Sequence, residues 1–511
     1  MAGGNASGGY SAQSDPLLGV VDPGAGPRLY PFEHDKRAYE IDLGPEPFVT
    51  LQWGAYFFVP SIRALKALPG LVELPLPQLP AAALPAAMPA RDDFAAWQGW
   101  LEDPNRRDAA WAWVRQQPGG VVATAYGVLV GAADRVQEVL RNAPDRYSVA
   151  GYGERMADSV GVGYLGLDDD SGHREQAPAV NKILEGVSEA DSFMLAYQVA
   201  SAGIAGLRQE AQALLAAFPP GQKPADLPTD TPLDLERLSE GVLAKLCQIW
   251  FGPPDGRYVW GTEFHPPGEA EAPRCPAALF RVSRYVFGPH PTPAVCAAGR
   301  QAGSAFTEAV DRWLAATPFE QLPKLSQAIL AAAGAVPGAP ADLPTRMLAG
   351  IMLGFPPTTH ANLLATLAIW VQTRKLWDLQ PQWHEVPATA SLPERYTAAV
   401  ARLRPALVAT LNYKPTPFQV WRRSRADHRL GGVDVKAGDT LVVAIGSATQ
   451  QDPLRHHIAF GGDRADPAGP PPHACPGYGM GMGVMLGVIA AVLDAGVLRF
   501  TGAPTVVALS V

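Results

Sequence analysis

Apolar residues recur along most of the chain at the spacing of α-helices. Residues 174–255 as a whole predict several helices, separated by short polar breaks. The segment 478–493 is apolar or glycine throughout, which predicts a helix buried on all sides. Further single helices are expected at 133–142, 233–251 and 344–372.

Strand-like alternation is limited to a few short segments. Residues 121–130 predict a strand pair, and strand signal dominates only after Arg422. There Gly431 and Gly432 separate two apolar alternations, which predicts a hairpin. A glycine-rich loop is expected to end at Gly166. The predicted fold class is therefore mainly α with small β-sheets (α+β).

The start of the chain differs in composition from the rest. Glycine and serine crowd the first residues, and proline recurs every few residues in 74–89, which excludes a regular helix. The aromatic-rich segment 48–60 is interpreted as a strand or loop that covers the main core. We therefore divide the chain into a Pro/Gly-rich N-terminal extension, 1–92, and a main domain, 93–511.

Charge limits the classes of partner. The 41 Lys and Arg residues stand against 49 Asp and Glu residues, for a net charge of −8, which argues against nucleic acid and anionic membranes. Charged residues make up 18% of the chain, below the roughly 25% of an average soluble domain, which indicates a large buried interior.

The same sequence favours a cytoplasmic protein without a membrane span. The N-terminus lacks a basic segment followed by an apolar core, and the run at 478–493 is shorter than the about 20 residues that a span requires. The four cysteines form no C-x-x-C pair, so neither a disulfide framework nor a zinc ribbon is expected.

The most informative window surrounds Cys475. It precedes the apolar helix, where a helix N-terminus supplies backbone N–H groups that stabilise a thiolate, the form that ligates metals. Gly477 permits close approach of the backbone to a ligand. Gly479, Gly483 and Gly487 lie four residues apart and predict a flat helix face suited to a flat cofactor. The alternative interpretation is a buried, inert cysteine.

His473, Cys475 and Gly477 match the last three fixed positions of the motif F-x-x-G-x-[HR]-x-C-x-G, so the chain resembles the cytochrome P-450 superfamily. Ala468 and Pro471 stand where Phe and Gly are usual, and an FGG triplet lies earlier, at 460–462. The resemblance extends in order from about residue 111 to the end of the chain.

The resemblance implies a P-450-like haem domain that binds haem b. Cys475 would be the axial ligand of the haem iron, and Arg422 and His173 would bind the haem propionates. The complete set that it implies is Cys475, His173, Arg422, His473 and Gly477 for the cofactor, and Thr358 and Thr359 for catalysis.

The sequence also departs from the family. Ala409 and Asn412 stand where the E-x-x-R pair is usual, and Pro357 replaces the acid that precedes Thr358 in the central helix. The family is thought to relay protons through that acid and the threonine. Pro356 and Pro357 are expected either to break the helix and free carbonyls beside the cofactor, or to form a simple kink.

Three functions follow from these observations. The first is a monooxygenase-type oxidoreductase that acts on an apolar organic or lipid-like small molecule and is fed by a separate ferredoxin and reductase. The second keeps the haem but uses a hydroperoxide or peroxide, as a hydroperoxide isomerase or peroxygenase does, and needs no proton relay. The third is a haem-binding protein that has lost catalysis, which the missing E-x-x-R pair would permit.

Overall fold

The computed structural model describes residues 88–168, 171–216, 231–252, 278–466, 469–500 and 505–509, together with five short strands between 29 and 74. Among these strands, β1 (Leu29–His34), β2 (Arg37–Asp42) and β5 (Val72–Leu74) form one sheet. Strands β3 (Leu51–Trp53) and β4 (Tyr56–Phe58) pair antiparallel within the aromatic segment. Most of the predicted extension lies outside the described residues, so its boundary at 92 stays a prediction.

The main body is helical, which confirms the predicted fold class. Its α-helices are α2 (Phe94–Glu102), α3 (Pro104–Gln116), α4 (Ala133–Arg141), α5 (Ala150–Ala157), α6 (Ser171–Glu185), α7 (Glu189–Ala216), α8 (Leu235–Phe251), α10 (Ala278–Phe287), α11 (Pro293–Ala316), α12 (Lys324–Gly334), α13 (Leu343–Gln372), α14 (Lys375–His384), α15 (Leu392–Arg402), α16 (Arg404–Tyr413), α17 (Ile445–Gln451) and α18 (Tyr478–Asp494). None of the described helices combines the length and hydropathy needed to cross a membrane.

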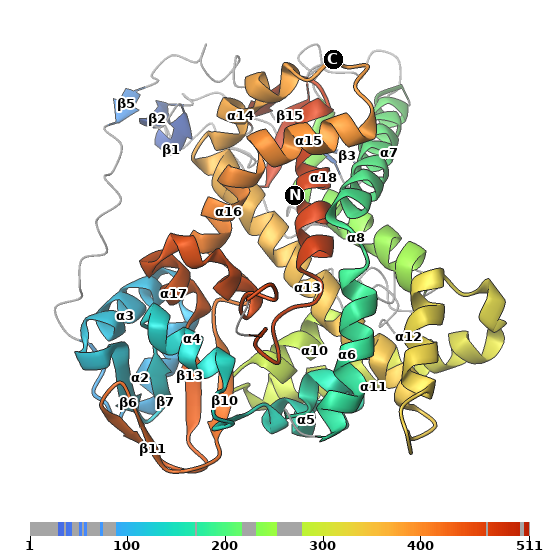
Figure 1. Cartoon of the computed structure of the whole chain (residues 1–511). Coiled ribbons are helices and arrows are strands. Elements are labelled where there is room, and N and C mark those ends of the chain that lie inside the picture. Colours follow the sequence, from blue (N-terminus) through green and yellow to red (C-terminus); the bar gives the residue numbers. More distant parts are fainter. Residues whose placement is uncertain are drawn as a thin grey trace.

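The largest sheet has the strand order β6-β7-β13-β10-β8, and only β7 and β13 pair in parallel. Its strands are β6 (Val121–Thr124), β7 (Gly127–Val130), β8 (Tyr147–Ser148), β10 (Val420–Ser424) and β13 (Thr440–Val443). A second sheet joins β9 (Thr231–Asp234), β14 (Leu498–Phe500) and β15 (Val506–Leu509). Figure 1 shows the large sheet at one side of the helical body.

The predicted hairpin is confirmed. Strands β11 (His428–Leu430) and β12 (Val433–Val435) pair antiparallel around Gly431 and Gly432. Both glycines have positive φ, 56° and 87°. Two such residues in succession match the twist of a two-residue hairpin turn, and glycine adopts them without steric cost.

Helix α13 crosses the centre of the molecule and contacts α18, which in turn packs along α7 (Figure 1). The half of α13 before residue 354 belongs to an apolar core shared with α5, α6, α10, α11 and α12. The half after residue 362 belongs to a second core, shared with α7, α8, α14, α15, α16 and α18. The middle of α13, where the two cores meet, is left to line a cavity.

The glycines of α18 pack against α7, which corrects one prediction. A Cβ on Gly483 would lie 2.3 Å from the carbonyl oxygen of Glu189, and a Cβ on Gly487 would lie 2.5 Å from that of Phe193. Both distances are far below van der Waals contact. The glycine face therefore lets two helices approach closely and does not seat a cofactor.

The glycine-rich loop predicted before Gly166 is also wrong, because it contains helix α5. A Cβ on Gly151 would lie 2.2 Å from the Trp421 ring, and a Cβ on Gly153 would lie 2.5 Å from the carbonyl oxygen of Gly166. Close packing, rather than loop flexibility, thus explains these glycines.

Candidate active site around Cys475

A cavity of about 270 Å³, with mostly apolar walls, lies between α13, β10 and the loop that precedes α18. The structure brings six of the seven predicted site residues to its wall: Thr358, Thr359, Arg422, His473, Cys475 and Gly477. The seventh, His173 of α6, packs on His473 with the ring centroids 4.7 Å apart. Residues far apart in the sequence therefore meet at one place.

Hydrogen bonds hold the loop that carries Cys475. The Cys475 N–H donates to the carbonyl of Phe460 at 2.8 Å, and Arg464 Nη1 donates to the carbonyl of Ala474 at 2.9 Å. Phe460 also lines the cavity. Phe460 is therefore the phenylalanine that lies beside the cysteine. The motif spacing had assigned this position to Ala468, which lies outside the described residues. The FGG triplet at 460–462 was the feature of the sequence that pointed to Phe460, whereas no feature of the sequence pointed to the role of Arg464.

Burial decides the protonation of Cys475. It raises the pKa of the thiol, while the Gly477 N–H and the charge of Arg464 oppose this shift. The backbone donor expected from the sequence is present, but it does not outweigh the desolvation of a thiolate. The thiol is therefore protonated when nothing is bound, and a metal ion would displace the proton as it binds.

Basic groups gather on one side of the cavity. Buried Arg422 donates from Nη1 to the Tyr152 hydroxyl at 3.1 Å and to the Trp421 carbonyl at 2.8 Å. Burial, followed by the charges of Arg422 and His173, lowers the pKa of His473 well below its ordinary value. A neutral imidazole beside a fixed guanidinium provides hydrogen bonding and charge for a bound carboxylate.

Helix α13 continues through Pro356 and Pro357. Of the two alternatives that the sequence left open, a break of the helix is not observed, although each proline still deprives the carbonyl four residues earlier of its N–H donor. Both prolines are buried, so packing holds the segment in helical form. The Thr358 hydroxyl donates to the Gly354 carbonyl. Asn362 Nδ2 then donates to the Thr358 carbonyl at 2.9 Å.

Asn412 carries a neutral amide at the position where the resemblance to the P-450 family places an arginine. Asn412 Nδ2 donates to the carbonyl of Pro453 at 2.9 Å, and the backbone carbonyl of Asn412 accepts from the Thr449 hydroxyl at 2.7 Å. Pro453 begins the 3₁₀ segment η6 (Pro453–Phe460) that leads to the cysteine loop. Ala409, at the glutamate position, is exposed. Asn412 thus anchors this segment without charge, a role that sequence reasoning missed.

The cavity wall fits a large planar group. A Cβ on Gly354 or on Gly481 would meet no atom within 4 Å, so both glycines border open space inside the cavity. Asn181 also lines the cavity, and its buried Oδ1 has no hydrogen-bond partner. Together with the Cys475 thiol and the Arg422 guanidinium, these features suit an iron porphyrin that carries carboxylates.

A helical body with small sheets, a long central helix and a cysteine loop before a buried helix is the fold of the cytochromes P450. Among solved structures, cytochrome P450 260B1 of Sorangium cellulosum So Ce56 matches with a TM-score of 0.51. The match covers 80% of this chain and 90% of that chain, at 16% sequence identity. No protein-family model and no curated protein matches the sequence. At this identity the comparison establishes a P450-like fold.

Proposed function

We propose that the protein is a haem-thiolate oxidoreductase that oxidises an apolar organic or lipid-like small molecule. The observation that carries this proposal is a cysteine thiol in the wall of an apolar cavity. Arg422, His473 and Thr358 of the central helix line the same cavity. The cofactor would be haem b, held through its iron by the Cys475 thiolate. A thiolate-held haem supplies an iron centre that activates oxygen or a peroxide.

The residues of the chain hold and surround this cofactor. Arg422 and His173 would bind its carboxylates, and His473 would donate a hydrogen bond to them. Gly477 and Gly481 leave room for the ring next to the backbone. The low affinity of this apolar wall for water keeps solvent away from the reacting atoms.

Apolar side chains define the substrate class. The cavity-lining side chains outside the cysteine loop include Val149, Leu165, Phe287, Ile351 and Phe355. Such a wall gains free energy from apolar contact and offers few groups to pair with a charged substrate. Electrons come from a separate ferredoxin and reductase in the monooxygenase form of this proposal, and the net charge of −8 disfavours nucleic acid as a partner.

The absorption spectrum of the reduced protein with carbon monoxide tests the cofactor assignment. The wild type is expected to give the Soret maximum of a thiolate-ligated haem, and Cys475→Ser is expected to lose it. Cys296→Ser is the matched control, because Cys296 lies outside this cavity. A folded but colourless wild type, or an unchanged spectrum in Cys475→Ser, would contradict the proposal.

A second candidate is the same haem site working with a peroxide or hydroperoxide. Pro357 cannot ionise, and the Thr358 hydroxyl donates to a carbonyl of its own helix, so this part of α13 carries no side-chain acid to relay protons. A peroxide already contains reduced oxygen and does not require that relay. Turnover with peroxide, but none with NAD(P)H and a ferredoxin system, would select this candidate over the monooxygenase.

A further inference from the structure

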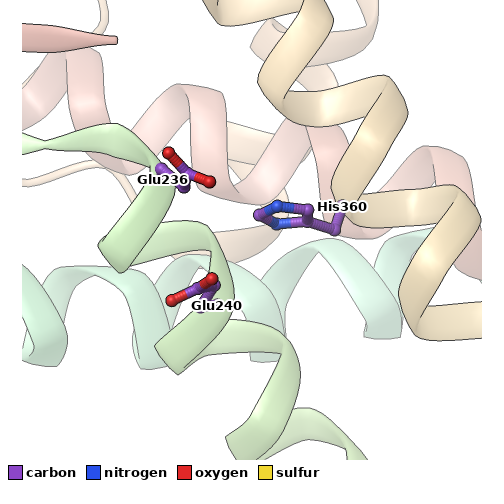
Figure 2. A group of neighbouring side chains, drawn as sticks. All are labelled: Glu236, Glu240 and His360. Atoms are coloured by element: carbon purple, nitrogen blue, oxygen red, sulfur yellow. The ribbon is translucent and has the colours of Figure 1, made fainter. Parts of the chain in front are cut away.

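Two glutamates and a histidine meet between α8 and α13, outside the cavity described above. Glu236 and Glu240 lie four residues apart on α8 and so project from one face of that helix. His360 of α13 reaches toward both carboxylates, as Figure 2 shows. One potential ligand atom from each of the three residues lies within 4.8 Å of the others.

The histidine ring is oriented by its neighbours. The Ser239 hydroxyl lies 2.9 Å from His360 Nδ1, and the ring of Phe280 meets it edge-on with the centroids 5.3 Å apart. This contact occupies Nδ1, so Nε2 would be the nitrogen that ligates a metal ion. A hydrogen bond from the second ring nitrogen is a regular feature of metal-binding histidines, because it fixes the tautomer and the ring plane.

The protonation of the histidine agrees with this geometry. His360 is 6% exposed, and burial lowers its pKa to about 4. The imidazole is therefore neutral near pH 7, which is the form that ligates metals.

We propose that Glu236, Glu240 and His360 bind one divalent transition-metal ion, with Zn²⁺ as the expected occupant, which cross-links α8 to α13. One imidazole nitrogen and two carboxylate oxygens are a zinc donor set, with solvent completing the tetrahedron. Mg²⁺ and Ca²⁺ prefer oxygen ligands alone.

The spacing is close to what zinc requires. Bonds of about 2.1 Å in a tetrahedral site place the ligand atoms about 3.4 Å apart. The present spacing therefore has to close by roughly 1.4 Å at most, which side-chain rotation of the two glutamates supplies. The cross-link would lie three residues after Pro357, on the part of α13 where two prolines remove backbone donors. It would tie that part of α13 to α8.

Metal content and zinc titration of the full-length protein test the site. After treatment with a chelator and return of Zn²⁺, the wild type is expected to bind one equivalent, whereas Glu240→Gln and His360→Gln are expected to bind none at this site. Glu308→Gln is the matched control, because Glu308 is an exposed helical glutamate. Cys475→Ser, the second control, is expected to keep its equivalent, which separates this site from zinc on the cysteine.

Two further readouts sharpen the test. Zinc at a hundredfold excess over its Kd should raise the thermal unfolding midpoint by about 3 °C in the wild type and not in His360→Gln. Ser239→Ala keeps all three ligands and should weaken zinc binding by about 10–100-fold, because it removes only the partner of Nδ1. Co²⁺ at the site should give the spectrum of nitrogen and oxygen ligands, without a thiolate charge-transfer band.

Several outcomes would overturn the proposal. These are a wild type that takes up no zinc equivalent, equal uptake by Glu240→Gln and the wild type, or a thiolate band with Co²⁺. If His360→Gln does not fold, Glu236→Gln and Glu240→Gln decide the question, because both glutamates are only partly buried and tolerate substitution better.

Discussion

Alanine substitutions along α18 should separate the glycines that pack helices from the glycine that borders the cavity. A Cβ on Gly483 would lie 2.3 Å from the Glu189 carbonyl oxygen and 2.9 Å from the Phe193 nitrogen. These are backbone atoms, which cannot rotate away, so α7 and α18 must move apart. A Cβ on Gly481 meets no atom within 4 Å and requires no such movement.

The size of the two effects follows from this geometry. Overpacking of a well-packed core costs about 1–3 kcal/mol. Replacing a glycine by alanine inside a helix stabilises the helix by about 1 kcal/mol, because alanine has the higher helix propensity. Gly483→Ala should therefore lower the free energy of unfolding by up to about 2 kcal/mol. Gly481→Ala should raise it by up to about 1 kcal/mol, while its methyl group enters the cavity and weakens haem retention.

A double substitution makes the argument sharper. Gly487 meets the same helix, with a Cβ position 2.5 Å from the Phe193 carbonyl oxygen. Once α7 and α18 have separated to accommodate one methyl group, a second methyl group requires less additional movement. The double variant Gly483→Ala/Gly487→Ala should therefore lose less free energy of unfolding than the sum of the losses in the two single variants.

Urea unfolding followed by circular dichroism measures the stabilities, and haem content per chain measures retention. The reasoning is refuted if Gly481→Ala destabilises the protein as much as Gly483→Ala. It is also refuted if Gly483→Ala loses haem while its stability is unchanged.

Four further predictions concern other residues of the site and its surroundings. Pro357→Asp introduces an acid beside Thr358 and should raise turnover with NAD(P)H and a ferredoxin relative to turnover with peroxide; an unchanged ratio would exclude a role for this position. Arg155→Leu removes a guanidinium that donates to four backbone carbonyls at and just after the end of α10, and hydrogen exchange there should accelerate, whereas unaltered exchange would show that the contact does not hold the segment. Asn412→Leu removes the hydrogen bond to the Pro453 carbonyl of η6, and urea unfolding should show a loss of about 0.5–1.5 kcal/mol. Burial lowers the pKa of His290 below 6.5, so the unfolded chain takes up a proton first and stability falls as the pH drops below about 6.5; this decrease should be smaller in His290→Gln when unfolding is measured across that range.

Periodicity predicted the elements whose packing follows the local pattern. The buried helix α18, the strand pair β6 and β7, and the hairpin at Gly431 and Gly432 all agree with the structure. The errors concern glycine and proline. Gly151 in α5 and Pro357 in α13 both lie inside helices, because the need for close packing against distant residues outweighs their local preference. Such tertiary contacts leave no periodic signal in a single sequence.

For the candidate site, motif order placed the chemically distinctive residues, and the structure gathers them around one cavity. The neutral partners could not be predicted in this way. Asn412 anchors η6 through its side-chain amide, and Tyr152 holds Arg422 through its hydroxyl. Asparagine and tyrosine occur throughout the chain, and only the fold shows which of them face a backbone carbonyl or a guanidinium.

The substitution of the E-x-x-R pair has an energetic meaning of its own. A buried ion pair gives up the hydration of two charges, and its attraction repays that cost only with good geometry. Asn412 carries no charge to desolvate, and its Nδ2 has a hydrogen-bond partner, although its buried Oδ1 has none among the described residues. Its bond to Pro453 keeps η6 in place, and η6 ends at Phe460, whose carbonyl holds the Cys475 N–H. Neutral hydrogen bonds from Asn412 and Cys475 thus help to place the cysteine, together with the Arg464 guanidinium that donates to Ala474. The absence of the E-x-x-R charges therefore does not by itself argue against the proposed haem site.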